Sequence, residues 1–168
     1  MKTEKDFWDQ AKELLEKYEV TYAANWKFDF LRDPKSLIFQ LSKCKFAMRM
    51  ATRGQNVLEL GCEIGIGASV IGEMAKSYVG VDTDAEGIEL ARKNHWNPKY
   101  QFICDEYVGK KYGTFDSIVA LDVMDRLKEG EIDLFLKGIV GQLAENGVVV
   151  LGVSAGEQVR EKLKDYFW

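Results

Sequence analysis

The stretch from Asn56 to Asp82 constrains the fold of this chain more than any other part of the sequence. An apolar run leads into closely spaced glycines, a helical pattern follows them, and a second apolar run ends at Asp82. We expect a strand, a tight turn, a helix and a second strand, the first unit of a nucleoside-binding α/β sheet. Glycines there let the backbone approach a ligand, and a carboxylate at residue 82 can accept hydrogen bonds from both ribose hydroxyl groups. The turn contains Gly61, Gly65 and Gly67.

Two acidic residues in the same stretch indicate which nucleoside is bound. A dinucleotide fingerprint has its second glycine two residues after the first, so that a pyrophosphate can approach, but this chain has Glu63 there. A carboxylate at that position repels a diphosphate. S-adenosylmethionine carries no phosphate, and its sulfonium and ammonium groups attract carboxylates such as Glu63 and Glu59. The sequence therefore favours S-adenosylmethionine over NAD.

The motifs VLELGCEIGIGA and VGVDTDAEGIELAR resemble those of the class I S-adenosylmethionine-dependent methyltransferases. The first motif of that family is usually E/D-x-G-x-G-x-G, and here Glu63 replaces the middle glycine. The alternative is an unrelated α/β protein with a glycine-rich turn. The resemblance implies that Asp105 hydrogen-bonds the adenine amino group, the alternative being a solvated loop acid. The cofactor-binding residues that it implies are Glu59, Gly61, Cys62, Glu63, Gly65, Gly67, Asp82, Thr83, Asp105, Glu106 and Leu121.

The resemblance covers about residues 56–153 and implies a fold for them. We expect an α/β protein with a Rossmann-like parallel sheet in the order 3-2-1-4-5 and helices on both faces. The lone histidine, His95, follows the helix after the second strand, so we expect it at the edge of the sheet opposite the ligand. The further expected elements are strands at 100–104, 118–121 and 148–153, a turn at 145–147, and helices at 85–94 and 131–143.

We expect a single domain, with a helical lid segment over residues 1–52 and a cofactor-binding core over residues 53–168. Apolar residues recur at helical spacing over residues 4–18. Asp33-Pro34 is the start signal of a second helix, which runs to about Met50.

The acceptor side of the site is predicted from the resemblance and from position. The family's N-terminal segment walls the acceptor pocket, so Tyr22 and Trp26 are assigned to that pocket; the alternative is that they fill the core. Asp122 and Asp125, just after the fourth strand, are the candidate catalytic bases. The alternatives are a ligand-contacting turn for Asp122 and a helix cap for Asp125.

Composition narrows the range of partners. The formal net charge is −4 and no basic block is present, which argues against a nucleic acid substrate. The cysteines lack metal-ligand or disulfide spacing, so we expect reduced thiols and no metal. The chain shows no signal peptide and no membrane-spanning run, so we expect a cytoplasmic protein. The cysteines are Cys44, Cys62 and Cys104.

One further helix is expected at residues 157–167, whereas class I methyltransferases usually add two more strands after the fifth. Without those strands the apolar fifth strand has an unpaired edge, which invites pairing or must be covered. We therefore expect a homodimer or hetero-oligomer formed through this edge or through the C-terminal helix. The alternative is a shortened chain or natural short form whose edge is solvated.

The resemblance implies methyl transfer from S-adenosylmethionine. The stretch LRDPKSLIFQLSKCKFAMRM is similar to bacterial methyltransferases of capsule, lipopolysaccharide or other small-molecule biosynthesis, which suggests a small-molecule or saccharide acceptor. The alternative is a non-catalytic methyltransferase-like partner or scaffold subunit that still binds S-adenosylmethionine or S-adenosylhomocysteine. Glu63, and Asp125-Arg126 where the family usually has Glu-His, favour that alternative. A nucleotide-dependent oxidoreductase is disfavoured by Glu63.

Overall fold

The computed structural model describes residues 33–51 and 55–153, together with isolated positions among the first 31 residues. The acceptor residues Tyr22 and Trp26, the predicted helix at 157–167 and most of the predicted helix at 4–18 lie outside the described residues. The division of the chain at residue 52 therefore stays a prediction. Each described helix is too short or too polar to cross a membrane.

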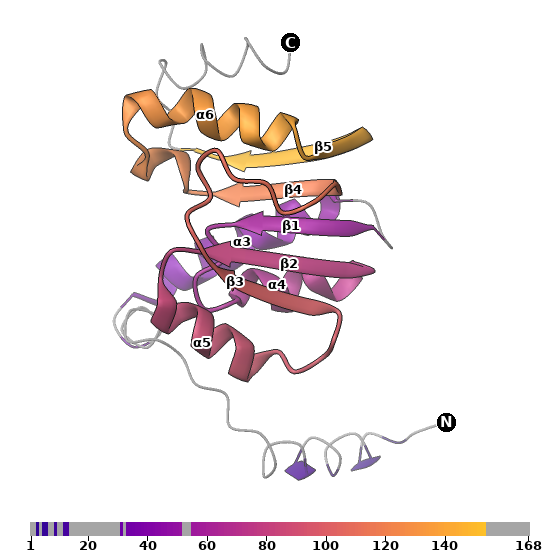
Figure 1. Ribbon diagram of the computed structural model, residues 1–168. Coiled ribbons are helices and arrows are strands. Elements are labelled where there is room, and N and C mark those ends of the chain that lie inside the picture. Colours follow the sequence, from indigo (N-terminus) through magenta and orange to yellow (C-terminus); the bar gives the residue numbers. More distant parts are fainter. Residues whose placement is uncertain are drawn as a thin grey trace.

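The core of the molecule is one sheet of parallel strands: β1 (Asn56–Leu60), β2 (Ser77–Asp82), β3 (Tyr100–Cys104), β4 (Phe115–Leu121) and β5 (Leu143–Gly152). Their order is β3-β2-β1-β4-β5, which confirms the predicted Rossmann-like topology (Figure 1). The central strand pairs on both sides, so that Leu58 lies between Val79 and Ile118. Because all strands run the same way, their carboxyl ends meet at one edge, where ligands bind in such sheets.

The helices are α3 (Pro34–Met50), α4 (Ile66–Val70), α5 (Ala85–Asn94) and α6 (Glu129–Val140), with short 3-10 turns η1 (Gly72–Met74) and η2 (Met124–Arg126). Side chains of the strands alternate between the two faces of the sheet, and an apolar core forms on each. Val57 and Tyr78 pack with α3, α4 and α5, whereas Leu58 and Leu60 pack with α6. Figure 1 shows α3 and α4 behind the sheet, α5 beside β3 and α6 beside β5. The helices therefore cover both faces, as predicted.

Local signals explain where the helices begin. The Asp84 carboxylate accepts a hydrogen bond from the Glu86 amide at 3.1 Å and so caps α5. Pro34 occupies the first turn of α3, as predicted, although the Asp33 side chain makes no capping hydrogen bond. The helix after the glycine turn is shorter than expected, because α4 ends at Val70 and a 3-10 turn follows it.

The edge strand β5 is interrupted where a turn was predicted. Its pairing with β4 changes from Phe115 with Leu143 to Ser117 with Val148, so the chain bulges between these two positions. Asn146 has a φ of 61°, in the left-handed region that asparagine tolerates. The predicted turn at 145–147 is therefore wrong: these residues belong to β5, which begins at Leu143 and not at residue 148, and a bulge takes the place of the turn. Among the described strands β5 pairs with β4 alone, and the covering of its other edge stays a prediction.

The connection from β3 to β4 crosses the sheet without a helix, in front of the strands in Figure 1. One buried side chain, Gln142, secures it. Gln142 accepts a hydrogen bond from the Tyr112 amide at 2.5 Å and donates to the carbonyls of Lys110 at 3.1 Å and Gly138 at 2.9 Å. The Tyr112 hydroxyl donates in turn to the Glu106 carbonyl at 2.7 Å. Because both ends of the buried amide have partners, these bonds hold the connection in one conformation.

Gln142→Met keeps the length of the side chain but leaves the Tyr112 amide and the Lys110 carbonyl without their buried partner. We expect the free energy of unfolding to fall by about 2–3 kcal/mol, because unsatisfied buried polar groups are costly. Urea denaturation measures this change. Gln101→Met, on the exposed part of β3, is the matched control and should change stability by less than about 0.5 kcal/mol. An equal loss in both variants would contradict the role of Gln142.

Candidate functional site

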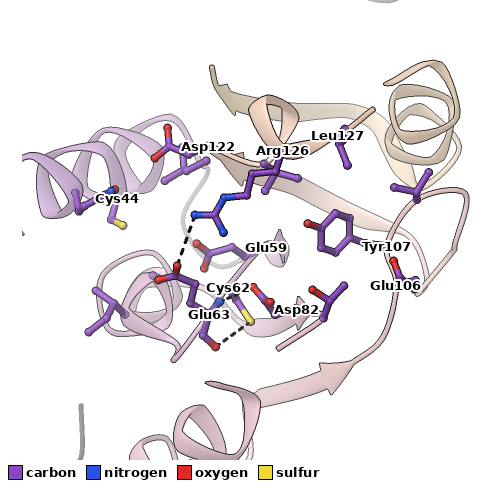
Figure 2. A pocket seen from close by; sticks show the side chains of 18 of the residues that line it. Cys44, Glu59, Cys62, Glu63, Asp82, Glu106, Tyr107, Asp122, Arg126 and Leu127 are labelled. Atoms are coloured by element: carbon purple, nitrogen blue, oxygen red, sulfur yellow. Dashed lines mark hydrogen bonds and ion pairs between the residues drawn. The ribbon is translucent and has the colours of Figure 1, made fainter. Parts of the chain in front are cut away.

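A pocket of about 380 Å³ lies at the carboxyl ends of β1, β2 and β4, where a parallel sheet predicts a ligand. Figure 2 shows Glu59 and Asp82 beside each other in the pocket, with Tyr107 opposite them. The sequence-predicted residues that line the pocket are Glu59, Gly61, Cys62, Glu63, Gly67, Asp82, Thr83, Glu106, Leu121 and Asp122.

Asp82 ends β2 with its side chain almost fully buried. One carboxylate oxygen accepts a hydrogen bond from the Glu63 amide at 2.8 Å, and the other accepts one from the Asp84 amide at 2.9 Å. These two donors set the direction of the carboxylate. Each oxygen keeps a lone pair that can accept a hydrogen bond from a ligand hydroxyl group. The geometry is compatible with the predicted contact to a ribose.

Glu63 stands where the family motif usually has its middle glycine, and its backbone keeps a conformation typical of glycine. Its φ is 45°, in the left-handed region, which costs a residue with a side chain about 1–2 kcal/mol. The Glu63 carboxylate lies 3.9 Å from the Arg126 guanidinium of η2, and Figure 2 marks this ion pair. Arg126 also lines the pocket, which the sequence analysis had not predicted.

Glu59 is a buried acid that lines the pocket, and a hydrogen bond from a neighbouring side chain fixes its carboxylate. The Tyr78 hydroxyl, which is fully buried, donates a hydrogen bond to it. Burial raises the pKa of Glu59 to about 7; the hydrogen bond from Tyr78 opposes this rise, and the charges of Asp82 and Glu63 add to it. A Cβ atom at residue 67 would overlap the Glu59 carboxylate, so a side chain there would have to displace this carboxylate.

The other two turn glycines pack against neighbouring elements. Gly61 has a φ of 78°, and a Cβ atom there would lie 2.5 Å from Val123. Gly65, also at 78°, does not line the pocket and packs against the ring of His95. His95 does not line the pocket, and its ring lies against Tyr100 at the start of β3, as predicted, but it is closer to the glycine turn than expected because α5 crosses close to the turn. Burial lowers the pKa of His95, so the ring is not held as a cation at the helix end.

The two acidic residues after β3, Asp105 and Glu106, have different surroundings. The Asp105 carboxylate lies 3.6 Å from the Lys110 ammonium and 3.4 Å from the Tyr112 hydroxyl, and Asp105 does not line the pocket. Glu106 and the unpredicted Tyr107 line it instead. The adenine contact of Asp105 stays a prediction that this orientation does not favour.

The two candidate bases are also separated. Asp122 lines the pocket and forms an ion pair with Lys43 of α3, a residue that the sequence analysis had not singled out. Its φ is 57°, and its amide donates to the Gly152 carbonyl at 2.8 Å. Asp125 lies on η2, is exposed and does not line the pocket. The geometry therefore favours Asp122 of the two.

Helix α3 contributes a wall of the pocket through Gln40 and Cys44. Its larger apolar side chains point elsewhere, since Ile38 is 64% and Phe46 59% exposed, so hydrophobic periodicity could not have identified the wall. Burial raises the pKa of the Cys44 thiol to about 12 and that of Cys62 beyond its usual range, so both stay protonated at neutral pH. Within the part of the chain that is described, no three potential ligands are grouped to hold a metal ion.

Comparison with known proteins identifies one family. A family model described as a methyltransferase domain matches residues 28–168. The ribosomal protein L11 methyltransferase of Thermotoga neapolitana is 27% identical over 136 residues, which cover 73% of this chain and 51% of that protein. The chain thus spans about half the length of this relative.

Solved structures agree on the fold. The structure of N-methyltransferase NodS from Bradyrhizobium japonicum with S-adenosylhomocysteine is similar with a TM-score of 0.68 at 19% identity, over 90% of this chain and 76% of that one. A TehB-like SAM-dependent methyltransferase from Corynebacterium glutamicum has a TM-score of 0.61 at 20% identity, over 90% of this chain and 73% of that one.

Glu59→Gln removes the buried acid and should change how stability depends on pH. The folded pKa of about 7 lies above the ordinary 4.5, so the folded protein holds a proton that the unfolded chain releases. The stabilisation that this proton gives is fully present below pH 4.5. It is lost as the pH rises to 7, and the free energy of unfolding falls by about 3 kcal/mol in total. The variant should therefore gain stability relative to the wild type over that range. Urea denaturation of both proteins from pH 4.5 to 7.5 measures this gain. A difference in the free energy of unfolding that stays constant over this range would contradict a raised pKa at Glu59.

Proposed function

Since the chain belongs to the methyltransferase family, we propose that it transfers a methyl group from S-adenosylmethionine to a small-molecule or saccharide acceptor. The observation that carries this proposal is the pair of buried carboxylates, Glu59 and Asp82, in a pocket beside a glycine turn. Carboxylates attract the cationic groups of this cofactor and repel the phosphates of a dinucleotide. The bound S-adenosylhomocysteine in the similar NodS structure supports the choice.

The lining residues allow an orientation of the cofactor to be proposed. Asp82, with a free lone pair on each oxygen, holds the ribose. The base then lies toward Thr83 and Tyr107, and the amino-acid end lies toward Glu59 and Leu121. Asp105 faces Lys110 and Tyr112, so side chains that line the pocket are better placed to contact the base.

The chain's part in the reaction is to position the acceptor, exclude water and accept a proton. When bound, the cofactor supplies a methyl group on a sulfonium that is already activated for in-line displacement. Gln40 and Cys44 of α3 form the wall that keeps the acceptor in line and excludes water. Asp122 takes the proton that a hydroxyl or amine acceptor loses, and Lys43 keeps its carboxylate in place.

A second candidate is the non-catalytic partner or scaffold subunit, favoured by the left-handed Glu63 and by Asp125-Arg126 in place of Glu-His. The Thermotoga relative is a ribosomal protein L11 methyltransferase, so a macromolecular acceptor is the alternative to a small one. We keep Tyr22 and Trp26 as acceptor residues, a cytoplasmic location, and a homodimer or hetero-oligomer through β5 or the C-terminal helix as parts of the proposal.

Asp82→Asn should weaken the binding of S-adenosylhomocysteine roughly 10- to 100-fold, because charge-assisted hydrogen bonds to the ribose are lost. Isothermal titration calorimetry measures the change. Asp84→Asn is the matched control, since asparagine also caps a helix and Asp84 does not line the pocket. Unchanged affinity in the folded Asp82 variant would remove this residue from the site.

Asp122→Asn tests both the acceptor and the base, since asparagine tolerates the left-handed backbone at this position. Methyl-labelled S-adenosylmethionine is incubated with the protein and a cell extract separated into small-molecule and macromolecular fractions. We expect label in the small-molecule fraction, and a rate about 10²–10⁴-fold lower in the variant. Asp125→Asn should retain most of the rate. Label in the macromolecular fraction would overturn the acceptor class, and cofactor binding without transfer to either would favour the non-catalytic subunit.

A further inference from the structure

The carboxyl group of Glu59 and the hydroxyl of Tyr78 form a buried pair at the pocket. Glu59 is 4% exposed, and Tyr78 is fully buried on the adjacent strand. The hydroxyl donates its hydrogen bond to the carboxyl group. Burial, together with the charge of Glu59, raises the pKa of Tyr78 well above its usual value, so it stays a donor. Glu59 nevertheless lines the pocket, so one end of the pair is accessible to a ligand.

Among the residues that the structure describes, the groups around Glu59 do not compensate a negative charge. Asp82 of β2 and Glu63 of the glycine turn are both carboxylates that raise its pKa, and α3 presents the neutral thiol of Cys44. The nearby cations serve other acids: Lys43 of α3 pairs with Asp122, and Arg126 of η2 lies 3.9 Å from Glu63.

A buried carboxylate without a facing cation is costly, and binding a proton is the least expensive way to neutralise it. A cation that enters the pocket reverses this balance, because it stabilises the ionised form directly. Tyr78 favours the same form, since a hydroxyl donates a stronger hydrogen bond to a carboxylate than to a neutral acid.

We propose that Tyr78 is a positioning residue of the cofactor site, and that the Glu59 carboxyl group which it holds releases one proton to solvent when the cationic amino-acid end of the cofactor binds. The O–H bond of Glu59 breaks, its electron pair stays on the carboxylate, and the ligand's positive charge replaces that of the proton. The pair thereby discriminates between ligands that carry this charged end and ligands that lack it. This inference rests on the proposed function, which supplies the cationic ligand.

The test is calorimetric titration of the wild-type protein at pH 6 in buffers of different ionisation enthalpy, which gives the number of protons released. The ligands are S-adenosylmethionine, S-adenosylhomocysteine and 5′-methylthioadenosine, which lacks the amino-acid end. At pH 6 the ligand ammonium group is fully protonated, so released protons come from the protein. We expect close to one proton for the first two ligands and none for the third. Zero protons for all ligands that bind would overturn the inference alone, and no binding by any would overturn the proposed function with it.

Variants separate positioning from structural support. Glu59→Gln should abolish the proton release, while Glu89→Gln, an exposed acid on α5, should leave it unchanged. The affinity of the wild-type protein for S-adenosylmethionine should rise up to roughly eightfold from pH 6 to 7.5. In Tyr78→Phe the midpoint of this rise should move to higher pH, because the hydrogen bond that favours the ionised form of Glu59 is gone. Gly67→Ala, which displaces the carboxylate without removing it, should reduce the selectivity for the charged ligands. Proton release that persists in Glu59→Gln, or an unmoved midpoint in Tyr78→Phe, would contradict the proposal.

Discussion

The hydrogen bond from the Glu63 amide to the Asp82 carboxylate is the interaction on which the rest of the site depends. It connects the turn after β1 to the end of β2. Glu63 and Asp82 are far apart in the sequence, but this bond holds them side by side in the pocket. The position of this turn also determines where Gly67 lies. Because Gly67 has no side chain, there is room beside it for the Glu59 carboxylate. The Asp84 amide shares the Asp82 carboxylate with the Glu63 amide, and the Tyr78 hydroxyl holds Glu59, so both carboxylates have a defined direction.

Burying these acids opposes stability and serves binding. Burial raises the pKa of Glu59 to about 7, so the apolar cores on both faces of the sheet must offset the cost of an acid at its centre. Such a local conflict is typical of a functional site in an otherwise consistent fold. The same conflict makes the pocket selective, because a cation relieves it and an anion increases it.

Much of the fold was predictable because it is encoded in local patterns. Apolar runs, glycines and capping residues follow one another in the chain, so the strands and α5 could be predicted before the structure was known, whereas the sheet order was implied by the family resemblance. Several local expectations differed from the structure. The helix after the glycine turn is shorter than its apolar pattern indicated, and His95 lies against Gly65 because α5 passes close to the turn.

The sequence by itself determined which residue types stand at the strand ends, and hence that the pocket holds Glu59, Glu63 and Asp82. Only the tertiary structure decided the partners that orient them. Tyr78 reaches Glu59 from the adjacent strand, and Lys43 of α3 reaches Asp122, which lies 79 residues later in the chain. Spacing along the chain predicts which face of its own element a side chain occupies. The contacts between elements follow from how they pack, which no local pattern contains.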